Sequence, residues 1–388
     1  MRKSTLLSAG LTVLLSGWAS GCAFLPLESH VVPGYPDRIG PEVAHDYREA
    51  VGVIHVHSRY SDGGWPVERI AQAANAQKLD FLILTDHNTL RGRADGKQGL
   101  HGRTLVLVDE EISTRGGHTL ALRLPREVES GRDPQATVDA VAAAGGLGFI
   151  AHPFSRRSSW TAPEAAGMTG LEIYSLREDV EDENPLILGP WALLTGADFS
   201  MPAWLDRPTE LLAYWDRLLA RGGKVVGIGS SNAHGLQRFG LRLAPYGTTF
   251  KMVRNHLLIR GELTGPAVYE ALEQGRLFVA HDVVSEGNGF LFAAVEGRQA
   301  QASQGRQAGR GGQIKAVMGE EVRFSPALKL YVYLPRPGRI RLFRSGAPVG
   351  EGKGQHAWFT PAGPGVYRVE ATRRGRAWIY SNPIYVIE

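Results

Sequence analysis

A pair of histidines separated by one residue, His55-Val56-His57, is the part of the sequence best suited to chemistry. The apolar run that begins at Val51 predicts a β-strand, and side chains alternate along a strand, so His55 and His57 are expected on the same side. Two imidazoles at one strand end can chelate a divalent cation, and Asp62, in the glycine-flanked turn that follows, can add a carboxylate. The alternative is that the two histidines are merely polar strand residues, which is the commoner meaning of an isolated His-x-His pair.

Further potential ligands lie at or near the ends of other predicted strands: His87, Glu111, His118, His152, Asn232 and His234. Six of the 12 histidines fall at such strand ends, whereas chance would scatter them through loops and helices. For one of them alone, such as His118, a structural hydrogen-bonded role is as good an explanation as ligation. Taken together, they favour a metal cluster.

Strands and helices alternate over most of the chain, which predicts a parallel α/β sheet, either open or closed into a barrel. In a barrel the C-terminal ends of the strands carry the active site. The predicted strands are 51–56, 81–85, 105–108, 119–122, 148–151, 171–174, 224–228 and 277–280, and the predicted helices are 66–77, 134–144, 211–221 and 266–274.

Two regions depart from this alternation. Residues 175–207 form an insertion that contains Trp191, Phe199 and Trp204, which is either a lid over the site or a packed surface subdomain. From about residue 287 the composition changes, and a Gly/Gln/Arg-rich stretch at 299–313 precedes short alternating strands at 328–334, 339–344, 356–359, 366–371 and 377–386. These strands, with a turn at 335–338 and another at Ser345-Gly346, predict a small all-β sandwich.

The N-terminus reads as a targeting segment. Two basic residues precede a mainly apolar run that is short for a membrane span, and small residues lead to Cys22, the single cysteine of the chain. A sole cysteine at this place resembles a bacterial lipoprotein signal, so we expect an exported, periplasmic protein anchored to the membrane by a lipid on Cys22. A plain secretory signal or an uncleaved anchor are the alternatives. Residues 1–22 are then the signal and 23–49 a tether.

Overall composition excludes little but argues against nucleic-acid binding. The chain has 388 residues, 43% of them hydrophobic, which suits a soluble globular protein of about two domains. Its formal net charge is +4, and its basic residues are scattered, so we expect no nucleic-acid partner.

Five motifs resemble the ordered motifs of the PHP family, named for polymerase and histidinol phosphatase. They are His55-Val56-His57, Thr85-Asp86-His87-Asn88-Thr89, Glu111-Ile112-Ser113-Thr114, Ala151-His152-Pro153 and Ser230-Ser231-Asn232-Ala233-His234. The resemblance implies a distorted seven-stranded β/α barrel over 50–286 with two or three divalent transition-metal ions. The C-terminal stretch 287–388 resembles the β-sandwich of secreted family members, a branch that includes carbaryl-hydrolase-like metallohydrolases.

The resemblance also implies a ligand set. His55, His57, Glu111 and Asn232 would hold one ion; Asp62, His87 and His234 the second; Glu111, His118 and His152 the third. Asn232 departs from the family pattern, which has Asp there, and a neutral amide cannot act as a base. Asp86 is a candidate for orienting His87, with Asp109 or Glu110 as a spare acid. Arg59, Arg156 and Arg157 are candidates for contacting an anionic substrate, although solvent-facing roles explain them equally well.

Charge then suggests the chemistry. Only Asp62 and Glu111 supply anionic ligands, so even two divalent ions leave the cluster positive, and an anion must enter. A metal-activated hydroxide meets that need near neutral pH, as does an incoming phosphate or polarised carbonyl. We therefore expect a metal-dependent hydrolase, with phosphoesters first and carboxylic esters or carbamates as the alternative. A metal-binding protein with lost or weak turnover is a third hypothesis, because of Asn232. His-rich sites completed by oxygen accept Zn, Mn or Fe.

Overall fold

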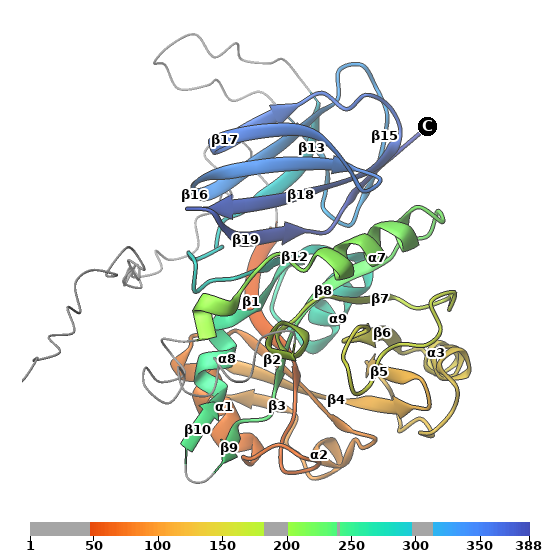
Figure 1. Cartoon of the computed structure of the whole chain (residues 1–388), viewed down its shortest axis with the longest axis vertical. Coiled ribbons are helices and arrows are strands. Elements are labelled where there is room, and N and C mark those ends of the chain that lie inside the picture. Colours follow the sequence, from red (N-terminus) through yellow and green to blue (C-terminus); the bar gives the residue numbers. More distant parts are fainter. Residues whose placement is uncertain (1–46, 182–200, 239–240, 297–312) are drawn as a thin grey trace, which may run out of the picture. The chain divides into compact units, whose positions relative to one another are not determined.

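A computed structural model describes residues 47–181, 201–238, 241–296 and 313–388. Seven strands close into a barrel in the order β1, β2, β4, β5, β6, β7, β8 and back to β1 (Figure 1). Neighbours are parallel except that β5 runs antiparallel to both β4 and β6, so the predicted α/β barrel is closed and mixed. The seven strands are β1 Tyr47–Val56, β2 Phe81–His87, β4 Thr104–Thr114, β5 Gly117–Leu122, β6 Leu147–Ala151, β7 Gly170–Ser175 and β8 Val226–Ala233.

The apolar residues of β2 serve two cores. Leu82 and Leu84 pack beneath helix α1, whereas Phe81 and Ile83 pack with residues of β6 and β8 on the opposite face. This alternation follows from the period of two along a strand, and burial on both faces explains the unbroken apolar run. The run therefore fixes β2, and with it the position of His87 at the strand end.

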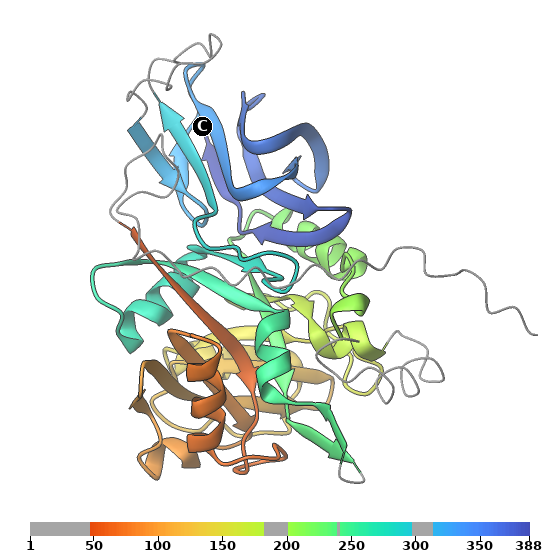
Figure 2. The same cartoon turned by 90° about the vertical axis from the view of Figure 1, so that its left-hand side faces the viewer.

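Helices cover the barrel, and side-chain caps set the starts of two of them, α3 and α9. In α1, buried side chains recur every three or four residues, and α1 lies against α8 (Figure 2). The carboxylate of Asp133 caps α3 by accepting from Ala136 N, and the hydroxyl of Thr264 caps α9 in the same way. The helical elements are α1 Val67–Ala76, α2 Arg91–Ala94, α3 Pro134–Ala143, α4 Leu176–Glu181, the 3-10 helix η1 Met201–Trp204, α7 Thr209–Leu219, α8 Tyr246–Met252 and α9 Gly265–Gln274.

The strands from β11 onward extend the sheet from the barrel to the C-terminus. β11 pairs antiparallel with β1, β12 with β11, and β19 with β12, so hydrogen bonding is continuous into the C-terminal strands. These strands share one core that also includes Leu258 and Phe278. They are β11 Arg254–Arg260, β12 Leu277–Ala280, β13 Leu291–Glu296, β14 Gln313–Val317, β15 Glu321–Arg323, β16 Lys329–Arg344, β17 Ala347–Phe359, β18 Gly365–Arg373, β19 Arg376–Ser381 and β20 Ile384–Ile387. Of the other strands, β3 Gly99–His101 pairs with β4, and β9 Leu236–Arg238 pairs with β10 Leu241–Ala244 in a separate two-stranded sheet.

Several predicted elements need correction. The strand predicted at 105–108 continues to Thr114, because pairing with β5 extends β4 beyond its apolar part. The predicted turn at 335–338 lies inside the single strand β16, whose register with β17 shifts between Tyr333 and Gly338. The strand predicted at 377–386 is two strands, β19 and β20, interrupted at Asn382-Pro383 because proline cannot donate to the ladder.

Some predictions fall outside the described residues. The signal segment, Cys22 and most of the tether precede residue 47, and Trp191 and Phe199 lie within 182–200. Contacts divide the chain into two units, and every described residue belongs to one of them, Val32–Glu388. The predicted domain boundary at residue 287 stays a prediction. Among the described residues, no helix is long and apolar enough to cross a membrane.

Candidate metal centre

The carboxylate of Glu111 is the centre of the candidate site. It lies on β4, is 1% exposed, and sits in register beside His87 of β2. Five imidazoles surround it. Its Oε1 lies 2.8 Å from His118 Nδ1 and 2.9 Å from His152 Nε2, and its Oε2 lies 3.1 Å from His55 Nε2, 3.2 Å from His57 Nε2 and 3.3 Å from His87 Nδ1. Side chains from β1, β2, β4, β5 and the end of β6 therefore meet at one carboxylate.

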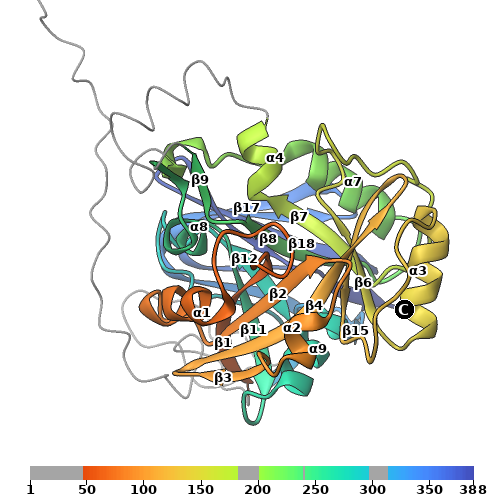
Figure 3. The ribbon, with the colours of Figure 1, turned by 90° about the horizontal axis from the view of Figure 1, so that it is seen from below.

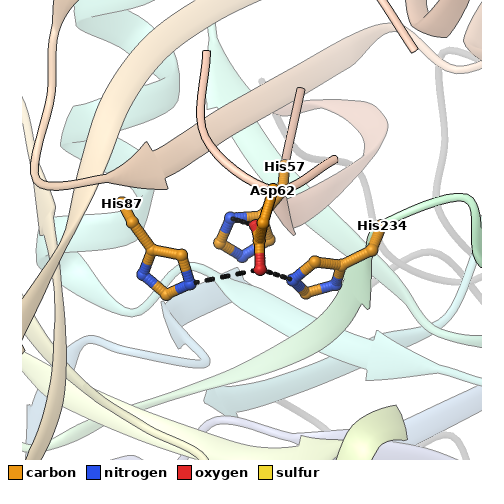
Figure 4. A group of neighbouring side chains, drawn as sticks. All are labelled: His57, Asp62, His87 and His234. Atoms are coloured by element: carbon orange, nitrogen blue, oxygen red, sulfur yellow. Dashed lines mark ion pairs between the residues drawn. The ribbon is translucent and has the colours of Figure 1, made fainter. Parts of the chain in front are cut away.

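Asp62 forms a second focus (Figure 4). Its Oδ2 lies 3.3 Å from His234 Nε2 and 3.8 Å from His87 Nε2, and its Oδ1 lies 3.5 Å from His57 Nδ1. The rings of His57 and His87 thus stand between the two carboxylates, with one nitrogen turned toward each. This bridging arrangement could not be read from the sequence.

Three groups of ligand atoms lie close enough together to hold a metal ion. They are His57, Asp62, His87 and His234; His55, His57 and Glu111; and His87, Glu111 and His118. The structure thus brings together the residues implied for the second ion and adds His57 to them. It also brings together most of the first set. Both His118 and His152 lie against Glu111, but the third group of atoms contains His87 in place of the His152 of the third implied set.

Asn232 lies at the end of β8, two residues before His234. Its backbone oxygen is 2.9 Å from His234 Nδ1, and its side-chain Nδ2 is buried without a hydrogen-bond partner. Its φ is 37°, a left-handed conformation that Asn adopts more readily than most residues. His55 and His152 also have positive φ, at 67° and 28°. Strained backbone of this kind gathers at functional sites, because the surrounding structure must hold it in place.

Asp86 and Arg59 make other contacts than the sequence predicts. The carboxylate of Asp86 accepts hydrogen bonds from Ser58 N at 2.8 Å, Ser58 Oγ at 2.6 Å and Ser61 Oγ at 2.6 Å. It therefore holds the loop that carries Asp62 rather than orienting His87. Arg59 is exposed, and its Nε donates to Gly64 O within the same loop. Arg156 and Arg157 are also exposed.

The Asp62 loop folds back tightly on β1, which requires glycine at position 63. Gly63 N donates to Ser58 O, and a Cβ at position 63 would lie 2.2 Å from His57 O. Tyr246 supports the same strand end, because its hydroxyl donates to His57 O at 2.6 Å. Any larger residue at position 63 would displace the loop, and with it Asp62.

Asp109 and Glu110, which the sequence suggests as a spare acid, make structural hydrogen bonds. Asp109 is fully buried and accepts from Tyr269 Oη at 2.6 Å and from Arg93. Glu110 accepts from Val128 N at 3.0 Å. Neither contacts the group centred on Glu111, so neither acts there as a spare acid.

Glu172 is a site residue that the sequence reasoning missed. It lies on β7, is fully buried, and reaches two of the histidines: Oε1 is 2.6 Å from His55 Nδ1, and Oε2 accepts from His152 N at 2.8 Å. The available signal was a single carboxylate within the buried apolar strand Leu171–Tyr174. Such an acid is costly to bury without partners.

Burial and charge set the protonation of the central groups. Burial alone would raise the pKa of Glu111, but the surrounding imidazoles, with His55 foremost, hold it well below its usual range. Burial would lower the pKa of His55, but Glu111 and Glu172 raise it to about 10. Burial lowers the pKa of His57 to about 3, so this ring is neutral and can offer a lone pair. Burial would raise the pKa of Asp62, but His234, with His57 and His87, lowers it below its usual range.

These residues fit divalent transition-metal ions. His57 Nε2 and His87 Nδ1 are buried without a hydrogen-bond partner, although each lies within 3.3 Å of Glu111. One carboxylate cannot satisfy five imidazoles, and leaving a buried polar atom unpaired costs about 1–3 kcal/mol. Ions ligated by imidazole nitrogen and carboxylate oxygen would satisfy these atoms. The structure fixes neither the number nor the identity of the ions.

Comparison with known proteins gives distant similarities. No family model matches the chain. An uncharacterized protein of Methanocaldococcus jannaschii is 28% identical over 118 residues, which cover 26% of this chain and 67% of that protein.

Two solved structures are similar at low scores. One is a two-domain protein of Bacteroides vulgatus that contains a predicted PHP-like metal-dependent phosphoesterase, with 15% identity, a TM-score of 0.43, and coverage of 88% of this chain and 97% of that chain. The other is a candidate metal-dependent phosphoesterase of Bifidobacterium adolescentis, with 16% identity, a TM-score of 0.33, and coverage of 51% and 93%. At such scores, the geometry of the site has to carry the functional argument.

Proposed function

We propose that this chain is a metal-dependent hydrolase of the PHP type, with phosphoesters as its first candidate substrates. The observation that carries the proposal is the convergence of five imidazoles on Glu111, two of them with buried nitrogens that have no hydrogen-bond partner. A buried cluster of this composition is costly to the metal-free fold, and ligation explains it.

The residues of the chain then have distinct tasks. Glu111 and Asp62 supply the anionic ligand atoms, and the neutral ring of His57 stands between them. Glu172 fixes the ring of His55 and the backbone of His152, so both are aimed before any ligand arrives. Bound divalent ions would lower the pKa of water and polarise the ester group.

Charge balance favours an anionic substrate. The ligand set offers two carboxylates, Glu111 and Asp62, and at least two divalent ions would leave an excess of positive charge at the strand ends. A phosphate group compensates that charge better than a neutral carbamate does. This preference is what places phosphoesters ahead of carboxylic esters and carbamates.

The test is metal analysis followed by a substrate panel. Reconstituted protein should hold at least two transition-metal ions per chain, and it should hydrolyse nitrophenyl phosphates faster than the matched nitrophenyl esters and carbamates. His57→Ala should lose metal and activity, whereas His356→Ala, at an exposed position of β17, should keep both.

Each failure has a separate meaning. One ion or fewer after reconstitution would contradict the cluster. If carbamates were hydrolysed faster than phosphates, the chain would still be a hydrolase, but its substrates would be carbamates rather than phosphoesters. Full metal loading without turnover on any ester would support a metal-binding protein instead.

A further inference from the structure

A pocket of about 310 Å³ opens beside the candidate metal centre. Its walls come from the loop after His152, the end of β7 with helix α4, and the start of α7. In Figure 3, α4 and α7 lie on the β7 side of the barrel. This volume falls in the range of small-molecule sites.

Two contacts and one short sequence separation place the pocket next to the cluster. Ser175 lines the pocket, ends β7 and is paired in register with Ser230 of β8. Ser230 Oγ lies 3.1 Å from His55 Nδ1, which belongs to the cluster. Phe154, which also lines the pocket, follows His152 by two residues. The pocket wall therefore lies one strand away from Ser230, the partner of His55, and two residues beyond His152.

The polar lining of the pocket is rich in carboxylates. Five carboxylate side chains and two guanidinium groups line the pocket. Arg207 turns both its Nε and Nη2 to Glu370, each at 2.7 Å, so its charge is already paired. On the acidic side, Glu181 is engaged with Arg177 and Arg156 N.

Among the buried polar atoms of the lining, Ser175 Oγ and Glu178 Oε2 have no hydrogen-bond partner. Ser175 is 2% exposed, and its Oγ makes no hydrogen bond. The Oε1 of Glu178 accepts from Phe154 N, which fixes the side chain and leaves its buried Oε2 without a partner. Both atoms are oxygens whose lone pairs can face a positively charged group of a ligand.

A bare metal ion does not suit this pocket. Among the described residues, the groups of ligand atoms close enough to hold an ion lie at the Glu111 and Asp62 clusters, and none includes Glu178 or Asp206. The pocket instead combines separated carboxylates with an aromatic wall. Phe154 is 41% exposed, and its ring packs edge-on against Tyr214. Carboxylates beside an aromatic ring are the surroundings that an organic ammonium group prefers.

We propose that this pocket binds an ammonium group carried by the ester substrate, with Ser175 and Glu178 as the residues that recognise it. The inference rests on the proposed hydrolase function for the identity of the ester. The substrate class is then a phosphoester with a cationic arm, whose phosphate lies at the metal centre.

The ionisation of Glu178 agrees with this assignment. Burial is the main cause that raises the pKa of Glu178 to about 8, and the negative charge of Glu172 is the second. An ammonium group beside this carboxyl would favour its charged form, so the cation would be bound in exchange for the proton.

The kinetic test uses two nitrophenyl phosphodiesters that differ in one atom: the choline ester, and its dimethylbutyl isostere in which carbon replaces nitrogen. On metal-loaded protein, KM should be about tenfold lower for the choline ester, with kcat little changed. Glu178→Gln, which keeps an oxygen for Phe154 N, should remove most of that difference, and Ser175→Ala should reduce it. Glu351→Gln, at an exposed position of β17, is the control. Equal KM values for the two esters in an active enzyme would overturn the proposal.

A binding test separates this proposal from the proposed function. Calorimetry of choline and of ethanolamine with metal-free protein reports on the pocket whether or not any ester is hydrolysed. Binding that Glu178→Gln weakens would support the pocket even if the hydrolase proposal failed. Whichever of the two ligands binds with the higher affinity would show whether the pocket prefers a methylated or a primary ammonium group. No binding of either ligand would overturn it.

Discussion

Asn232 is the residue at which the expected chemistry and the observed chain differ most. The other implied metal ligands are histidines and carboxylates, whereas Asn232 is neutral and its Nδ2 is buried without a partner. It also holds a φ of 37°, which Asp tolerates about as well as Asn. Substitution by Asp is therefore a change of charge with little change of shape.

We predict that Asn232→Asp tightens metal binding and raises kcat. The added carboxylate supplies one negative charge toward the cations and a proton acceptor, and a general base contributes roughly 10²- to 10⁴-fold. Metal titration and kcat and KM for a phosphoester and a neutral carbamate check the prediction. If the amide is kept because it spares an anionic substrate from repulsion, KM should rise more for the phosphoester than for the carbamate. Unchanged metal affinity and kinetics would mean that the side chain does not face the ions.

Some residues of the site could be predicted from the sequence, and others could not. His55, His57, His87 and Glu111 could be assigned to one cluster because such residues rarely recur at strand ends without a shared ligand. Glu172 could not be assigned, because its task is defined by partners on two other strands, His55 and His152. The unpaired nitrogens likewise depend on ring orientation, which spacing along the chain does not determine.

At the scale of elements, apolar periodicity identified the strands and helices that bury one apolar face, and it failed where polar side chains are buried. Strand β11 was missed for this reason. Its Asn255 and His256 are fully buried, Asn255 exchanging hydrogen bonds with the backbone of Gly229. A strand that is stabilised by specific polar partners has no alternation of apolar residues by which the sequence alone could identify it.

His256 joins three strands through charge. On β11, its Nδ1 lies 2.6 Å from Glu49 Oε1 of β1, and its Nε2 lies 3.2 Å from Asp282 Oδ1, which follows β12. Arg254 also contacts Asp282, at 3.1 Å. Burial would lower the pKa of His256, but Asp282 and Glu49 raise it to about 9. The ring is thus charged in the folded protein at neutral pH.

This raised pKa predicts a pH-dependent stability. A folded-state pKa above the unfolded value of about 6.5 contributes stability that is present below pH 6.5 and is lost as pH rises through about 9. The contribution is on the order of 3 kcal/mol. The loss of unfolding free energy in His256→Gln should therefore be larger at about pH 6 than at about pH 9.5. Urea denaturation at the two pH values measures it, and an equal loss at both would mean that the folded protein holds a neutral ring.

At the scale of the molecule, the question is whether the C-terminal strands unfold with the barrel. A buried ion network crosses between them. Arg368 of β18 is 2% exposed, and its Nε and Nη2 lie 2.8 and 2.7 Å from the carboxylate of Asp216 on α7. Its Nη1 donates to Glu370 at 2.7 Å, and Glu370 also accepts from Arg207 and Arg341. With the pairing of β12 to β19, these contacts tie the two regions together.

We predict that Arg368→Met lowers the free energy of unfolding of the whole described fold by about 3–5 kcal/mol, because breaking a buried pair leaves a carboxylate without its partner. The matched control is Arg339→Met on β16, whose pair with Glu351 is exposed on both sides and should cost less than about 1 kcal/mol. Trp215 on α7 and Trp378 on β19 are fully buried, and variants in which one of them is replaced by Phe separate its signal from those of the other tryptophans. Coincident transitions at both tryptophans, shifted together by Arg368→Met, would show one cooperative unit. Two transitions, with only the one reported by Trp378 shifted, would instead support an independently folding C-terminal domain beginning near residue 287.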